Sequence, residues 1–150
     1  MLTLKIRPAE EKDIDSIAAL EPLCFDDPWT PQMIRSDVMD IPFSTYVLGE
    51  VDEKLVGYVG IMVVRDECQV NNVAVHPDYR KKGIGGTLLK TALSFAKKNA
   101  AEEAFLEVRE SNDDAISLYE SMGFKRLGIR KGYYENNGEN AVVMRKDLMV

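Results

Sequence analysis

Residues 72–86 read NVAVHPDYRKKGIGG and are the most informative stretch of this 150-residue chain. An apolar segment runs through a turn at Pro77 into three basic residues and then into glycines at the start of a helical pattern. Glycines cost helix stability, so a compensating role is expected. Glycine backbone lets N–H groups approach a ligand closely, and a helix N-terminus adds free donors and a positive dipole end. The stretch therefore predicts either an anion site suited to a pyrophosphate or a flexible, solvated basic loop.

The hydrophobic pattern on both sides of this loop predicts strands before it and a helix after it. A helix over residues 83–99 is indicated by apolar side chains on one face, namely Ile84, Leu88, Leu89, Ala92 and Phe95. Three apolar runs bounded by tight turns predict an antiparallel meander of strands at residues 45–51, 54–65 and 67–75.

The rest of the chain predicts a mixed sheet covered by helices. Strands are expected at residues 2–7, ended by Pro8, and at 104–108, 124–134 and 140–148, the last two joined by the polar turn 136–138. Helices are expected at residues 13–23, from an N-cap at Thr30 to before Pro42, and at 113–122 with Gly123 as the stop. The order β-α-α-β-β-β-α-β-α-β-β is an α/β fold of the mixed-sheet α+β kind, expected to form a single domain over residues 1–150.

Composition narrows the possible environments and partners. The net charge is −6, from 19 basic and 25 acidic residues, which disfavours direct nucleic-acid binding. The uncharged run from Leu55 to Val64 has ten residues, whereas a membrane span needs roughly 18 or more. Cys24, Cys68 and the single His76 are too few for a structural zinc site. We expect a metal-free, cytoplasmic protein with no secretory signal, no membrane association and a monomeric or weakly dimeric state.

The motif Arg80-x-x-Gly83-x-Gly85 resembles the acetyl-CoA signature Q/R-x-x-G-x-G/A of the GNAT N-acetyltransferase superfamily. The element order also resembles that fold, in which the strand before the loop splays from the next one. The resemblance implies acetyl-CoA as cosubstrate, with pantetheine and acetyl contacts from Val73, Ala74 and Val75. It implies phosphate contacts from Lys81, Lys82, Gly83, Ile84, Gly85 and Gly86.

The second half of the chain resembles the RimI subfamily, whose members acetylate the N-terminal alanine of a small-subunit ribosomal protein. The matching segments are FDDPW at 25–29, FLEVRESN at 105–112, AISLYESMGF at 115–124, GYY at 132–134 and AVVM at 141–144. The resemblance implies Glu107 as general base, Tyr119 as general acid and Asn112 as a coenzyme contact. From the residues alone, Glu107 also fits a solvent-facing strand glutamate, Tyr119 a core aromatic and Asn112 a helix N-cap.

The chemistry favours an α-amine acceptor over a lysine. At pH 7, deprotonation costs about 1 kcal/mol for an α-amine and about 4.6 kcal/mol for a lysine. Tyr133 and Tyr134 resemble the substrate-loop tyrosines of N-terminal acetyltransferases. Trp29 is expected either to line the substrate groove or simply to pack against the protein. We expect direct transfer in a ternary complex to a protein N-terminus, that of a ribosomal protein. The alternatives are a broad-specificity N-terminal, lysine or small-molecule amine acetyltransferase, and a non-catalytic acyl-CoA-binding module.

Overall fold

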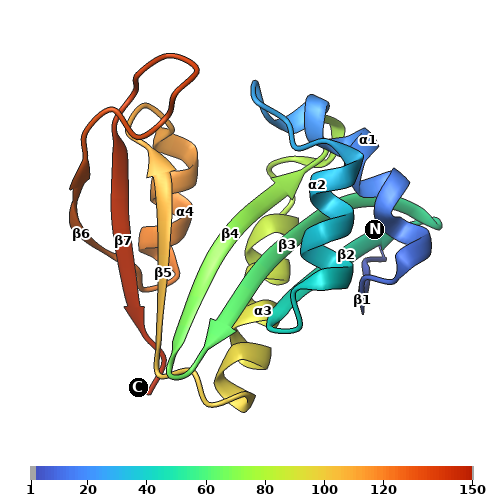
Figure 1. Cartoon of the computed structure of the whole chain (residues 1–150), viewed down its shortest axis with the longest axis horizontal. Coiled ribbons are helices and arrows are strands. Elements are labelled where there is room, and N and C mark those ends of the chain that lie inside the picture. The colour runs from blue at the N-terminus through green and yellow to red at the C-terminus, as the bar shows by residue number, and fades with distance from the viewer. Residues whose placement is uncertain (1–2, 150) are drawn as a thin grey trace.

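A computed structural model describes residues 3–149 as a twisted sheet with helices on both faces (Figure 1). The order of main elements is the expected β-α-α-β-β-β-α-β-α-β-β. The elements are β1 (Lys5–Pro8), α1 (Ile14–Cys24), α2 (Pro31–Arg35), β2 (Ser44–Val51), β3 (Lys54–Val64), β4 (Glu67–Val75), α3 (Ile84–Lys98), β5 (Glu103–Arg109), α4 (Asp113–Ser121), β6 (Lys125–Arg130) and β7 (Ala141–Asp147). The predicted mixed-sheet architecture is confirmed.

The strands lie in the order β1-β2-β3-β4-β5-β7-β6. Neighbours are antiparallel except for β4 and β5, which run parallel. The predicted meander of β2, β3 and β4 is therefore confirmed. Its first turn places Asp52 and Glu53 at φ values of 50° and 64°, the left-handed geometry that a two-residue hairpin turn requires.

The parallel pair β4–β5 is joined along only part of its length. Pairing runs from Glu67 with Glu103 to Val70 with Leu106, and no pairing follows. Beyond that point the two strands diverge, as the separation between green β4 and orange β5 in Figure 1 shows. The expected splay is present, and it leaves one edge of β4 without a neighbouring strand.

A β-bulge in β4 changes which side chains face which helices. Gly60 of β3 pairs with Asn72 and Ile61 pairs with Val70, so Asn71 is an extra residue. An extra residue reverses the alternation of faces. Cys68 and Val70 lie in the core under α3 and α4, whereas Ala74 lies in the core under α1 and α2.

The sheet separates two apolar cores. The larger one lies under α3, where the predicted stripe packs through Leu88, Leu89 and Ala92. Phe95 was expected in this stripe but is 41% exposed, because it lies at the edge of the buried helical face. The second core lies under α1 and α2, where the Thr30 hydroxyl accepts a hydrogen bond from the Met33 amide and caps α2 as predicted.

Three expected boundaries are different in the structure. Pro8 does not end the first strand but pairs with Val47, which an edge strand permits because its outer side needs no N–H donor; the expected start at Leu2 lies outside the described residues. α2 ends at Arg35 and continues as a π-helical turn, Ser36–Asp40. β6 ends at Arg130, so residues 131–134, expected in a strand, belong to the loop before β7.

Candidate active site

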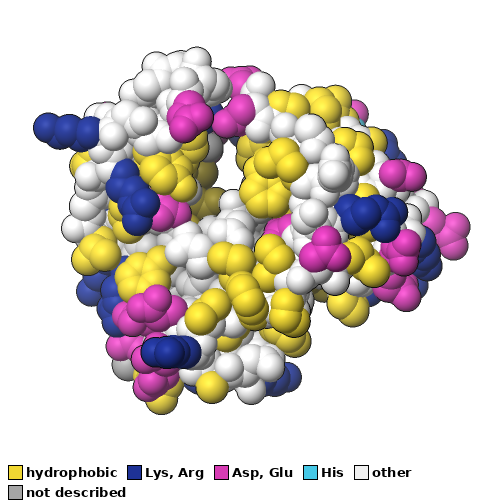
Figure 2. Space-filling view, viewed as in Figure 1, with side chains coloured by type: hydrophobic (Ala, Val, Ile, Leu, Met, Phe, Trp, Pro, Cys, Tyr) yellow, Lys and Arg dark blue, Asp and Glu magenta, His cyan; other side chains and the backbone are white. Residues whose placement is uncertain are grey.

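The splay between β4 and β5 opens into a hollow between the two halves of the molecule, which Figure 2 shows from the side of α1 and α2. The backbone of β4 borders it. The His76 amide donates to the Val56 carbonyl at 2.7 Å. In an antiparallel pair, only every second residue forms hydrogen bonds with the facing strand. The N–H and C=O groups of Ala74 therefore bond to β3, whereas those of Val73 and Val75 point toward the gap. Of the three residues that the sequence named, Val73 presents its backbone N–H and C=O to a ligand, and Val75 presents its N–H.

The carbonyl of Val75 is already engaged. Arg80 Nε donates to it at 3.0 Å and Cys24 Sγ at 3.4 Å, which ties the end of β4 to the basic loop and to α1. Burial raises the pKa of the Cys24 thiol, and it raises that of Cys68 to about 12. Both thiols are therefore protonated at neutral pH and are poor nucleophiles.

The basic loop forms a concave set of backbone donors. Lys81 and Gly83 have φ values of 61° and 78°, and Gly83 is the N-cap of α3. The amides of residues 84–86 have no acceptor within the helix because they lie in its first turn. Lys81 and Lys82 are exposed beside them. Free donors, the positive helix end and two cations together can hold a pyrophosphate.

The two glycines in the first turn of α3 also allow close packing. A Cβ on Gly85 would lie 3.3 Å from Val75 Cγ2, and one on Gly86 would lie 3.4 Å from a methyl group of Leu118. A Cβ at position 85 would therefore crowd Val75, whereas one at position 86 would only reach ordinary contact with Leu118. Gly85 thus keeps the loop and the strand edge within reach of one ligand.

Glu107 lies on β5 one residue beyond the last parallel pair. Its side chain is only 15% exposed, unlike a solvated strand glutamate. Gln69 Nε2 donates to Glu107 Oε2 at 2.8 Å, and Arg130 Nε lies 3.8 Å from Oε1. Gln69 thus fixes the orientation of the carboxylate at the start of the splay, through a contact that the sequence pattern did not indicate.

Tyr119 lies in the core, as its helical spacing allowed. Its ring is buried in the core and lies edge-on to Phe124, with centroids 6.0 Å apart. Burial, and to a lesser extent the nearby Tyr134, raise the pKa of the phenol above its usual value. The phenol therefore stays protonated across the physiological range and has a proton that it can donate.

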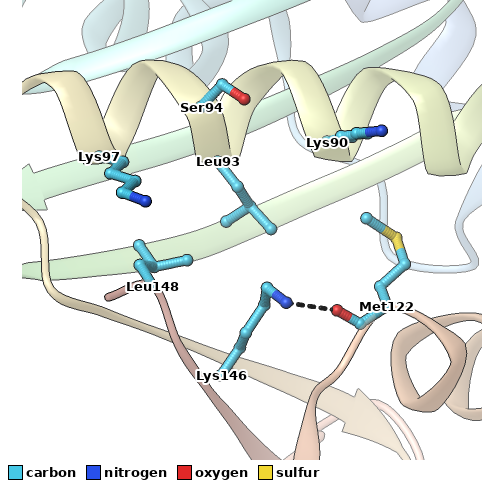
Figure 3. Close-up of a pocket in the computed structure, with 7 residues that line it drawn as sticks. All are labelled: Lys90, Leu93, Ser94, Lys97, Met122, Lys146 and Leu148. Atoms are coloured by element: carbon cyan, nitrogen blue, oxygen red, sulfur yellow. Dashed lines mark hydrogen bonds between the residues drawn. The ribbon is translucent and has the colours of Figure 1, made fainter. Parts of the chain in front are cut away.

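Both ends of α4, the helix that carries Tyr119, are capped by side chains. Asn112 Oδ1 accepts from the Ala115 amide at 3.1 Å, which confirms the N-cap interpretation. Lys146 Nζ donates to the Met122 carbonyl at 2.6 Å (Figure 3). These contacts fix the position of Tyr119 relative to β5 and β7.

The Lys146 contact lies in a pocket of about 340 Å³ that is separate from the basic loop. The pocket lies between α3, the end of α4 and β7, with an apolar floor and lysines at its rim (Figure 3). It is lined by Lys90, Leu93, Ser94, Lys97, Met122, Lys146 and Leu148. No residue of the loop 80–86 lines it, so it is not part of the candidate site.

Gly123→Ala is expected to destabilise the protein by about 1–3 kcal/mol. Gly123 has a φ of +97°, and a Cβ there would lie 2.7 Å from Lys146 Nζ. The substitution therefore strains the backbone and displaces the lysine that caps α4. Urea unfolding would measure the loss, with Gly128→Ala as the control, because a Cβ at Gly128 meets nothing within 4 Å. An equal and small effect in both variants would contradict this account of the cap.

Arg109 organises the mouth of the hollow, although no sequence signal indicated it. Its guanidinium lies 3.9 Å above the ring of Tyr134 and reaches Asn136 Oδ1 at 3.0 Å. It also lies 3.4 Å from Glu139 and 3.6 Å from Asp27, which belongs to the loop between α1 and α2. Arg109 therefore links the two loops that flank the gap, a contact set by loops that are distant in sequence.

Tyr133 and Tyr134 lie together on the loop after β6. Their rings meet edge-to-face with centroids 5.0 Å apart, and Tyr133 remains 43% exposed. Burial is the main cause that raises the pKa of Tyr134 to about 12. The pair offers an aromatic surface beside Arg109 at the rim of the gap.

Trp29 is held from beneath by a buried carboxyl group. Its amide donates to Glu21 Oε1 at 2.8 Å, and the Tyr58 hydroxyl donates to Glu21 Oε2. Glu21 is 1% exposed, and its burial raises the pKa of the carboxyl. The indole packs partly buried on the core under α1 and α2. Packing is thus an established part of Trp29's role, and its neighbour Glu21 was not predicted.

Two kinds of feature are absent from residues 3–149. No group of three or more His, Cys, Asp or Glu side chains in this part of the chain could hold a metal ion. None of the helices there combines the length and the apolar character that a bilayer-crossing helix needs.

Comparisons with known proteins agree with this geometry. The model of the acetyltransferase (GNAT) family matches residues 14–124. The chain is 38% identical over 141 residues to the N-alpha-acetyltransferase RimI of Mycobacterium tuberculosis, covering 90% of this chain and 87% of that protein. It is 33% identical over 156 aligned positions to an N-alpha-acetyltransferase of Saccharolobus solfataricus, covering 95% and 92%. The crystal structure of the ribosomal-protein-S18-alanine N-acetyltransferase from Escherichia coli matches with a TM-score of 0.90 at 30% identity, covering 97% and 94%.

Proposed function

Because this chain belongs to the GNAT acetyltransferase family and is an acetyl-CoA-dependent N-acetyltransferase of the RimI type, we propose that its acceptor is the N-terminal alanine of ribosomal protein S18. The observation that carries the proposal is that β4 and β5 stop pairing after Val70 and Leu106, which leaves an opening between the strands. Glu107 lies beside this opening, and the turn before α3 offers the free amides that an anion needs. Relatives named for α-amine acetylation, which cover most of the chain, support the choice of acceptor.

The residues present fit acetyl-CoA. The free amides of residues 84–86, with Lys81 and Lys82, would hold the pyrophosphate, and the outward edges of Val73 and Val75 would hold the pantetheine arm. When bound, the cosubstrate supplies the thioester. A backbone N–H of β4 would then donate to the thioester oxygen as charge develops there.

The chain's own groups would handle the two proton movements. Glu107, directly or through water, would take a proton from the amine nitrogen as the new N–C bond forms. Tyr119 would donate to the sulfur as the C–S bond breaks, because its phenol stays protonated. Because both cysteine thiols stay protonated, neither is suited to form an acetyl-enzyme intermediate. The acetyl group would therefore pass directly from the thioester to the amine. Tyr133, Tyr134 and Trp29 would surround the first residues of the peptide.

The acceptor is tested with matched peptides. We expect rapid acetylation of a peptide that carries the S18 N-terminal sequence beginning with alanine. The same peptide with a blocked N-terminus and an internal lysine should react at least about 100-fold more slowly, because the lysine must first lose a proton from a group of higher pKa. Mass spectrometry of the products would locate the acetyl group. Preferential lysine acetylation would instead support the broader amine acetyltransferase.

A further inference from the structure

The side chain of Asn72 is buried without a hydrogen-bond partner for its oxygen. Asn72 is 8% exposed, and its Oδ1 has no partner among residues 3–149. The other buried polar side chains in this part of the chain are all bonded: Asp13 to Arg7, Glu21 to the Trp29 amide, and Asp37 to Ser44. An unsatisfied buried polar atom costs about 1–3 kcal/mol, so its presence requires an explanation.

The β-bulge places Asn72 at the opening of the splay. Asn72 is two residues beyond Val70, the last residue of β4 that pairs with β5. Its partner across the sheet is Gly60, where a Cβ would lie 3.0 Å from the ring of Tyr46. The Tyr46 ring therefore packs directly over Gly60, beside Asn72, and a larger residue at position 60 would crowd that ring.

Asn72 shares this face with the candidate base. Leu106 and Val108 of β5 point into the core under α3, so Glu107 between them points to the opposite face. Ala74, two residues after Asn72, belongs to the core under α1 and α2, so Asn72 points the same way. A carboxylate and a free amide oxygen thus lie on one face, where the two strands part.

The polar groups nearest this face are committed elsewhere. The Tyr46 hydroxyl donates to Asp37 Oδ2 at 2.6 Å, and the Tyr58 hydroxyl donates to Glu21. Gln69 Nε2 donates to Glu107. The protein itself therefore leaves the Asn72 oxygen as an acceptor that an outside donor can satisfy.

We infer that Asn72 Oδ1 accepts a hydrogen bond from the incoming amine and holds its nitrogen beside Glu107. This inference rests on the proposed function for the choice of acceptor, although it concerns an amine nitrogen that any acceptor would bring. An amine presents several N–H groups, and the proton that leaves for Glu107 is only one of them. A second acceptor fixes the direction in which the nitrogen lone pair points.

An amide suits this position better than a second carboxylate would. A negative charge close to an ammonium group favours its charged form and so raises its pKa. The reaction needs the neutral amine. A neutral acceptor holds the nitrogen while adding little to the cost of deprotonation.

The first test replaces the oxygen with a group of similar shape. Asn72→Leu is expected to lower kcat/KM for the peptide about 10- to 100-fold, the loss of one hydrogen bond at the reacting centre. Its Tm should be unchanged or higher, because the unsatisfied oxygen is removed, and calorimetry should show unchanged acetyl-CoA affinity. The control is Asn71→Leu at the exposed bulge residue, which should retain wild-type activity.

The second test keeps the acceptor and adds a charge. Asn72→Asp is expected to move the acid limb of the kcat profile to higher pH, because the new carboxylate favours the ammonium form of the bound substrate. The ionisable groups of the surrounding elements are Glu107, Glu21, Asp37, Tyr46 and Tyr58, and they are the same in both proteins. A purely structural asparagine would not produce this shift.

The outcomes separate this inference from the proposed function. Wild-type kcat/KM in Asn72→Leu, or a loss that only accompanies a lower Tm, would overturn the role of Asn72. If the wild-type enzyme prefers the lysine peptide, the proposed acceptor is wrong. The same variants are then compared on the lysine peptide, where the same fall in kcat/KM is expected and its absence counts against Asn72.

Discussion

Glu107→Gln is expected to lower kcat for N-terminal acetylation by about 10²- to 10⁴-fold, the usual contribution of a positioned general base. The amide keeps the size of the side chain but cannot take a proton. Because the change is on β5 and not in the loop at residues 80–86, calorimetry should show unchanged affinity for acetyl-CoA. Steady-state kinetics with the alanine peptide would measure the fall in kcat.

The chain offers a matched control for this variant. Glu103 lies on the same strand and the same face, and it pairs with Arg145 at 2.6 Å at the far end of β5. Glu103→Gln should therefore retain the wild-type kcat. Equal activity of wild type and Glu107→Gln would show that Glu107 takes no part in the reaction and is an ordinary strand glutamate.

Tyr119→Phe is expected to lower kcat by about 10²-fold or more, since it removes the donor to the departing sulfur. The ring and its contact with Phe124 are retained, so thermal unfolding should show little change in Tm. A large loss of Tm at unchanged kcat would show that Tyr119 only packs the core.

The pH dependence adds an independent check on Tyr119. Its pKa is raised, so the proton is retained to higher pH than in a free tyrosine, and protonation is lost only above that raised value. The wild-type kcat should therefore show no alkaline decline due to Tyr119 below about pH 10, the ordinary tyrosine pKa. An alkaline limb below that pH that disappears in Tyr119→Phe would contradict the buried, neutral phenol.

The features that the sequence predicted correctly depend on local rules. The Thr30 cap, the tight turn at Asp52 and Glu53, and the stop at Gly123 each follow from the conformational preferences of a few neighbouring residues. The basic loop before α3 was recognisable for the same reason, because its chemistry lies within one short segment. The resemblance then supplied the splay, which no local pattern contains.

The features that could not be predicted from the sequence depend on contacts between distant segments. The bond from Gln69 to Glu107 requires the register of two strands 38 residues apart. The Arg109 cluster requires two loops to meet, and Asp27 and Glu139 are acidic residues with no individual signature. The end of β6 at Arg130 was missed because Tyr133 and Tyr134 have high strand propensity, yet they lie in a loop stabilised by Arg109.

The extra residue at Asn71 lies where β4 stops pairing with β5. Because Val70 and Asn72 already face consecutive residues of β3, Ile61 and Gly60, deleting Asn71 would join them into a regular ladder and leave the later positions of β4 on their present sides. The deletion would instead remove the local kink and the added twist that a bulge gives to a strand, and with them the bend at the point where the two parallel strands part.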